Sequence, residues 1–183
     1  MRKNAFTLIE IMVAVAIFAI LLTAFTGFFL SAVQAQRKTL ASQELIDNVS
    51  YNLEYMSRAI RMARKDMAGS CLTTAKYNYE TNAERNRIKF INYDGVCQEF
   101  FLDVNDRRLY ESKNGETALP LTPVGLEVLS FRFGPSDSWG QEQGTQPRVI
   151  LFLEVKGKGQ KPELQPLIKI QTTISQRNPN RIY

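Results

Sequence analysis

The stretch Phe6-Thr7-Leu8-Ile9-Glu10 opens an apolar run that continues to about Val33. Residues 11–22 contain no charged or polar side chain, and residues 23–30 add only two threonines and one glycine. As a helix rising about 1.5 Å per residue, a run of about 28 residues reaches about 42 Å, whereas a bilayer core needs about 20 apolar residues. The sequence therefore predicts a transmembrane helix over residues 6–33.

The residues before the run distinguish it from a secretory signal peptide. Such a signal has a basic region, about 7–15 apolar residues and then a small-residue cleavage site on the far side. Here only Met1-Arg2-Lys3-Asn4-Ala5 precedes the run, and no such site closes a short hydrophobic segment. Glu10 is unusual as well, because an ionised carboxylate within a membrane helix costs up to about 2.5–3.5 kcal/mol, less near an end. It is a functional candidate that needs a partner.

Residues 1–10 resemble the class III signal of type IV pilins and type II secretion pseudopilins. In that family a prepilin peptidase cuts on the cytoplasmic side, just before the phenylalanine, and methylates the new amine. The resemblance implies a cleaved leader of residues 1–5, cleavage between Ala5 and Phe6, and N-methylation of Phe6. Glu10 matches the family's fifth-position glutamate. Two positions differ: Ala5 replaces the usual glycine, and Gly27 replaces the helix-kinking proline of many major pilins.

The charges of the mature N-terminus suit this resemblance. The amine of Phe6 is a cation beside apolar lipid, and Glu10 is an anion one helical turn further along. A stagger between neighbouring subunits places the amine of one beside the carboxylate of another, which offsets two otherwise unpaired charges in a low dielectric. The alternative is a plain signal anchor with an isolated glutamate near its cytoplasmic end.

The orientation in the membrane does not follow from charge alone. Arg2 and Lys3 lie at one end of the run and Arg37 and Lys38 at the other, so the positive-inside rule is indecisive. The short leader leaves nothing to hold outside the cell. We therefore expect a single-pass inner-membrane protein with a cytoplasmic N-terminus and an extracytoplasmic domain.

The composition limits the remaining function classes. The chain has 183 residues, 44% of them hydrophobic and 10% aromatic, which leaves enough for one globular domain beyond the membrane run. The net charge of +5 favours a solvated basic surface over a nucleic-acid site. The chain has no histidine and only two cysteines, and it lacks Gly-rich phosphate-binding and hydrolase motifs. We expect no catalysis, no cofactor and no metal site.

Beyond the apolar run the helical pattern becomes amphipathic, and we assign residues 34–68 to a continuation of the same helix. One apolar stripe follows helical spacing; it comprises Leu45, Val49, Leu53, Met56, Ile60, Ala63 and Met67. Gly69 is the expected C-terminal stop. We interpret the lower half as a filament core and the upper half as a surface for the chain's own domain; the alternative for the stripe is core packing alone.

Residues 69–183 are predicted to form a β-rich globular domain. Six segments combine strand propensity with turn signals between them: residues 87–93, 97–104, 108–113, 126–133, 148–156 and 167–175. Short strands joined by tight turns indicate a mostly antiparallel sheet, and one long helix packed on it gives two layers. The predicted fold class is α+β and pilin-like.

Two features of the domain leave alternatives open. A Cys71–Cys97 disulfide would close a loop of about 27 residues, worth about 3.6 kcal/mol in the chain-entropy estimate; the alternative is two free, buried thiols. Trp139, in the Gly-rich segment 134–144, either folds back onto the sheet, which we favour, or forms a contact at a loop tip. Asp137 and Glu142 in that segment are weak candidates for calcium ligands.

The order of segments in the second half resembles J-type minor pseudopilins and the related large minor pilins. This resemblance rests on residues 128–133, the loop with Trp139, residues 147–153 and a late strand. It implies a structural subunit of a filament-tip complex, with prepilin peptidase, other minor and major pilins or pseudopilins, and the inner-membrane assembly platform as partners. The alternative is a pilin-type binding module that contacts DNA, a surface or a secreted substrate through its exposed domain.

Overall fold

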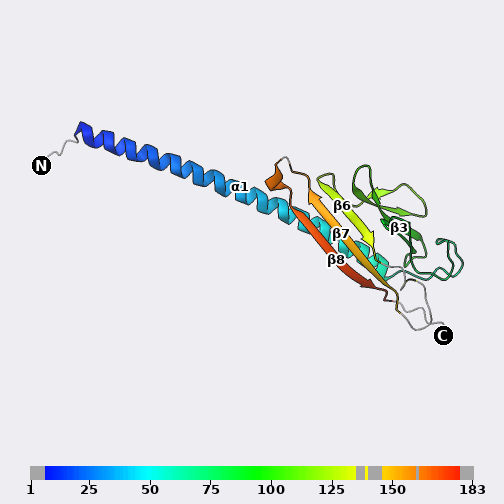
Figure 1. Cartoon of the computed structure of the whole chain (residues 1–183). Helices are drawn as coiled ribbons and strands as arrows, with labels where there is room; N and C mark the ends of the chain where they lie inside the picture. Colours follow the sequence, from blue (N-terminus) through cyan, green and yellow to red (C-terminus); the bar gives the residue numbers. More distant parts are fainter. Residues whose placement is uncertain (1–6, 135–138, 140–145, 160, 178–183) are drawn as a thin grey trace. The chain divides into compact units, whose positions relative to one another are not determined.

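A computed structural model describes residues 7–134, 139, 146–159 and 161–177. The chain divides into two units, residues 1–40 and residues 41–183. The first unit contains the apolar half of helix α1 (Leu8–Arg61), and the second contains the amphipathic half of α1 with the β-strands (Figure 1). One long helix with antiparallel sheets confirms the predicted α+β, pilin-like architecture.

The amphipathic half of α1 buries most of the predicted stripe. Leu45, Val49, Met56, Ile60 and the following Ala63 are at most 3% exposed. The stripe differs from prediction at its end, because Met67 is 57% exposed.

Helix α1 ends at Arg61, earlier than the predicted stop near Gly69. Its last carbonyls find partners outside the helix, so no further helical turn is needed to pair them. The Tyr79 hydroxyl donates to the carbonyl of Ile60 (2.7 Å) and the Arg177 N–H donates to the carbonyl of Arg61 (2.8 Å). The chain then turns to extended backbone, where the Arg64 N–H donates to Ile91 of a neighbouring strand (2.8 Å).

The strands form two antiparallel sheets, where the sequence analysis expected one. The first sheet has five strands in chain order: β1 (Glu80–Thr81), β2 (Arg87–Ile91), β3 (Cys97–Asp103), β4 (Arg108–Lys113) and β5 (Leu119–Pro120). The second has three: β6 (Leu126–Phe133), β7 (Arg148–Gly157) and β8 (Leu167–Ser175). A short 3₁₀ helix, η2 (Pro162–Leu164), precedes β8.

The six predicted strands are present, with bounds within two residues of those expected. The two-residue strands β1 and β5 were not predicted, because pairs of residues show no periodicity. The separation into two sheets arises at β6, whose free edge meets turns of the first sheet. The Val128 N–H donates to the carbonyl of Arg107 (2.8 Å) and the Phe133 N–H donates to that of Arg85 (3.0 Å). Strand β6 therefore makes single hydrogen bonds to turns of the first sheet and does not pair with β4 as a neighbouring strand.

One hydrophobic core joins the amphipathic half of α1 to both sheets. Each element contributes fully buried side chains, among them Leu45 and Ile60 of α1, Phe90 and Phe100 of the first sheet, and Phe131 and Leu151 of the second. Full burial of such a side chain contributes about 1.5–3 kcal/mol. The core therefore fixes the position of both sheets on the amphipathic half of α1.

Trp139 lies in this core, which confirms the interpretation that it folds back onto the domain. Its side chain is 1% exposed, its indole Nε1 donates to the carbonyl of Arg148 (3.0 Å), and its ring meets the edge of Tyr79. The proposed calcium ligands Asp137 and Glu142 lie outside the described residues.

Candidate functional site

The apolar half of α1 presents its side chains to the surroundings. The large hydrophobic residues from Leu8 to Leu30 are all more than half exposed. Three hydroxyls in this half bond back to the helix: those of Thr23, Thr26 and Ser31 donate to carbonyls three or four residues earlier (2.8–3.0 Å). Its surface is therefore apolar without unpaired hydroxyls, as a lipid or helix-bundle environment requires. By length and composition, α1 can cross a membrane.

Glu10 lies in the first turn of this helix. Its backbone N–H donates to the carbonyl of Thr7 (3.1 Å), and its side chain is exposed. A carboxylate in the first turn is stabilised by the positive end of the helix dipole. Within the described residues no basic side chain forms an ion pair with Glu10. Ala5 and Phe6 lie outside those residues. The structure therefore places the Glu10 carboxylate but does not describe the amine of Phe6, its predicted partner.

The sequence of this region has a counterpart among known families. Residues 1–26 match the prokaryotic N-terminal methylation motif. The match includes Ala5, Phe6 and Glu10 and supports a type IV pilin-like chain that prepilin peptidase processes and that assembles with other pilins. It indicates a structural subunit rather than an enzyme. Comparisons with curated proteins and with solved structures found no match.

The domain contains a disulfide between Cys71 and Cys97, whose Cα atoms are 5.4 Å apart. It joins the loop after α1 to the first residue of β3. Cys71 is 8% exposed. The bridge therefore attaches the segment that follows the helix to the first sheet.

Asp66 organises the same loop, and the sequence analysis did not single it out. Its carboxylate is buried and accepts hydrogen bonds from backbone N–H groups, the shortest from Cys71 and Leu72 (both 2.8 Å) and a longer one from Ser70 (3.1 Å). Burial alone raises the pKa of Asp66, but the N–H donors of Leu72, Cys71, Ser70 and Gly69 together lower it to about 2. The only available sequence signal was an aspartate a few residues before a Gly-Ser pair, which is typical of a turn.

A second polar group lies between α1 and the first sheet. The carboxylate of Glu111 is 7% exposed and accepts from the Tyr55 hydroxyl (2.7 Å) and from Gln98 Nε2 (2.5 Å). Burial raises the pKa of Tyr55, and the hydrogen bond to Glu111 raises it further. Burial lowers the pKa of Lys113, but the Glu111 carboxylate and the Tyr55 hydroxyl together outweigh this effect and raise the pKa. The group stabilises the packing of the helix on the sheet.

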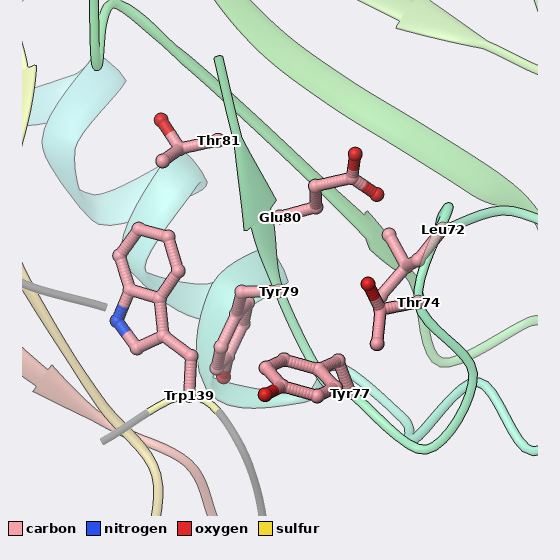
Figure 2. Close-up of a pocket in the computed structure, with 7 residues that line it drawn as sticks. All are labelled: Leu72, Thr74, Tyr77, Tyr79, Glu80, Thr81 and Trp139. Carbon is pink, nitrogen blue, oxygen red and sulfur yellow. The ribbon is translucent and has the colours of Figure 1, made fainter. Parts of the chain in front are cut away.

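Two hollows lie on the surface of the domain. The first, about 180 Å³, is lined by Trp139, Tyr79 and the residues around β1 (Figure 2). Its main charged group, Glu80, accepts from both the N–H and the hydroxyl of Thr73 (2.7 and 2.8 Å). The second, about 500 Å³, lies at the end of α1, where Arg58, Arg61 and Arg177 surround Met62. Arg58 there is paired with Glu54 (2.7 Å).

Among the described residues no group of three or more His, Cys, Asp or Glu side chains is placed to hold a metal ion. The polar groups around Trp139 serve the fold. The arginines at the end of α1 form a basic surface suited to contacts with acidic groups.

The outer face of the first sheet carries a row of rings and guanidinium groups. Arg87 lies over the ring of Phe101 (4.8 Å), Phe101 stacks on Tyr110 (5.8 Å), and Arg108 lies near the ring of Tyr110 (5.8 Å). Because β2 and β4 flank β3, Arg87 and Tyr110 occupy opposite sides of the Phe101 ring. The ring faces are thus engaged within the sheet and are not open for stacking on nucleic-acid bases.

Proposed function

We propose that the protein is a minor pseudopilin or minor pilin, a structural subunit that assembles through its N-terminal helix into a type II secretion pseudopilus or a type IV pilus. The observation that supports this most is the methylation motif over residues 1–26, which leads into an exposed apolar helix half. A filament subunit needs both: the motif for maturation and an apolar helix to lie first in the membrane and then among neighbouring helices.

In this proposal, peptidase cleavage between Ala5 and Phe6 creates a new amine that is methylated. The amine of Phe6 in one subunit then pairs with the carboxylate of Glu10 in a neighbour. The exposed first-turn position of Glu10 supports such a contact. In an apolar bundle the pair replaces two isolated charges, each of which opposes burial by several kcal/mol.

The minor-subunit assignment is the finer part of the proposal. The sequence order of residues 128–133, the segment with Trp139, residues 147–153 and a late strand resembles J-type minor pseudopilins and supports this assignment. We infer a role in the tip or initiation complex, with other minor and major subunits and the inner-membrane assembly platform as partners. The basic surface at the end of α1 suits contacts with unlike subunits. The N-terminus lies in the cytoplasm and the β-rich domain beyond the inner membrane.

Intact-mass analysis of the protein from its native membrane tests the proposal. We expect a mass that lacks residues 1–5 and carries one additional methyl group. The matched control is the same chain from cells without prepilin peptidase, which should retain its full mass. An uncut chain in cells with active peptidase, or a cut at another peptide bond, contradicts the proposal.

A further inference from the structure

The margins of the two sheets are unequal. Among the described residues, β1 and β5 end the first sheet with two residues each, and the outer edge of β6 meets the carbonyls of Arg85 and Arg107. Strand β8 is different: it has nine residues, pairs with β7 without a register shift, and lies at the margin of its sheet (Figure 1). Folded proteins usually shorten, bulge or cover a strand edge. Among the described residues of the second unit, no strand pairs with the outer edge of β8.

The hydrogen-bonding groups on this edge follow from the register. In an antiparallel pair, successive residues alternate between bonding to the partner strand and directing N–H and C=O away from it. The bonds from Gly157 N–H to Pro166 (2.9 Å) and from Gln176 N–H to Pro147 (3.0 Å) show that the even-numbered residues face β7. The residues that direct both backbone groups outward are therefore Leu167, Lys169, Gln171, Thr173 and Ser175.

The core is also incomplete beside this edge. Ile168 and Ile170 are on the core-facing side of β8 but are only partly buried, whereas their partners on β7, Val155 and Leu153, are 1% and 3% exposed. A strand added next to β8 would bring side chains over the two isoleucines. The outward backbone groups and the partly exposed isoleucines would therefore both be satisfied by an extended segment that pairs with β8.

From these observations we propose that the outer edge of β8 is a strand-addition site that binds an extended segment of a different filament subunit. The inference rests on the proposed function. Main-chain bonds to the outward residues supply the contact, and apolar side chains at alternate positions of the incoming segment cover Ile168 and Ile170.

A second copy of the chain fits this edge less well. Two β8 edges that pair antiparallel around a two-fold axis close on themselves, whereas a filament grows through contacts between two different surfaces. Such a contact needs a different strand edge on the partner. Among the strands that the structure describes, β8 is the long one at a sheet margin without a partner, which favours a segment of another polypeptide as the occupant.

Site-specific photo-cross-linking in the full chain, expressed with its filament subunits, tests the site. A photoreactive residue at Thr173, beside the edge, should cross-link to one extended segment of a different subunit, identified by mass spectrometry of the linked peptides. The same residue at Val104, an exposed position elsewhere in the domain (67%), should not reach that segment.

Proline variants distinguish the contribution of the backbone N–H groups of β8 from that of its side chains. Gln171→Pro removes an outward N–H without removing a bond to β7, since proline is tolerated where the N–H faces away from the ladder. We expect the cross-link yield to fall at least about tenfold, while Gln171→Thr, which keeps the N–H, leaves it unchanged. Burial of Trp139, followed by fluorescence, verifies that each variant is folded; if Gln171→Pro is not, Ser175→Pro at another outward position replaces it.

The outcomes distinguish this inference from the proposed function. A mature chain that enters filaments but links to a second copy, to lipid or to nothing overturns the edge proposal alone. An unchanged yield in a folded proline variant does the same. A chain that is neither cleaved nor found in filaments overturns the proposed function, and with it the edge proposal.

Discussion

Replacement of Asp66 by asparagine should strongly destabilise the domain. The carboxylate is 1% exposed, and each of its oxygens accepts from backbone N–H groups. A fall in its pKa from 3.8 to about 2 corresponds to about 2 kcal/mol in favour of the folded state. Asparagine also directs an NH₂ group at N–H donors, which costs about 1–3 kcal/mol more. Together these contributions predict a loss of about 3–5 kcal/mol.

The assay is urea unfolding of the full chain in detergent, followed by the fluorescence of Trp139, the single tryptophan, which is 1% exposed when folded. Asp103→Asn is the matched control, because Asp103 accepts one bond in an exposed turn, from the Asn105 N–H (2.8 Å). It should change the free energy of unfolding by less than about 0.5 kcal/mol. An equally small effect of Asp66→Asn would refute the reasoning.

The pH dependence provides a second check on Asp66. The pKa of its carboxyl is lower in the folded state, about 2, than the ordinary value of 3.8. Its ionised form therefore stabilises the fold fully above about pH 4, and this contribution is lost as the pH falls towards 2. The stability difference between the wild type and Asp66→Asn should shrink over that range.

Three further changes test other parts of the molecule. Glu10→Ala should leave peptidase processing intact but impair incorporation into filaments, measured by the amount of chain in sheared filament fractions. Gly134→Ala should destabilise the domain by about 1–3 kcal/mol in urea unfolding, because its new Cβ would lie 2.6 Å from the Cβ of Ile150. Tyr55→Phe should cost about 1–2 kcal/mol, since the buried carboxylate of Glu111 loses a hydrogen-bond donor.

The Gly134 and Tyr55 variants each have a control in the same chain. Gly125→Ala places its Cβ in open space, and Tyr51→Phe changes a side chain that is 73% exposed, so both should be nearly neutral. Normal filament incorporation of Glu10→Ala would remove the support for the charge pair. Equal effects of a test variant and its control would show that the contact in question contributes nothing.

The sequence predicted the elements with strong periodicity. The alternation in residues 87–91 and 167–175 and the helical spacing from Leu45 to Ile60 are local properties, and each appears in the fold. The end of α1 and the division into two sheets were not predictable in this way. They depend on hydrogen bonds between distant residues, such as Tyr79 to Ile60 and Arg177 to Arg61, for which the local sequence contains no signal.

The candidate site shows the same division. The methylation motif is a contiguous sequence, so Ala5, Phe6 and Glu10 were identifiable directly from the residues. Asp66 and Glu111 were not, because their importance arises from burial and from donors that the fold places around them. The free edge of β8 likewise becomes visible only when the strand order is known.

The bonds that finish α1 have a consequence for the order in which the protein matures. The carbonyl of Ala63 accepts from Gln176 Nε2, 113 residues later in the chain, and that of Arg61 accepts from Arg177. A ribosome releases α1 first and the Gln176 donor 113 residues after Ala63. In the proposed topology the far end of α1 therefore stays unpaired until β8 has been synthesised and has folded onto the helix. If the chain is a filament subunit as proposed, its domain is complete only after β8 has folded.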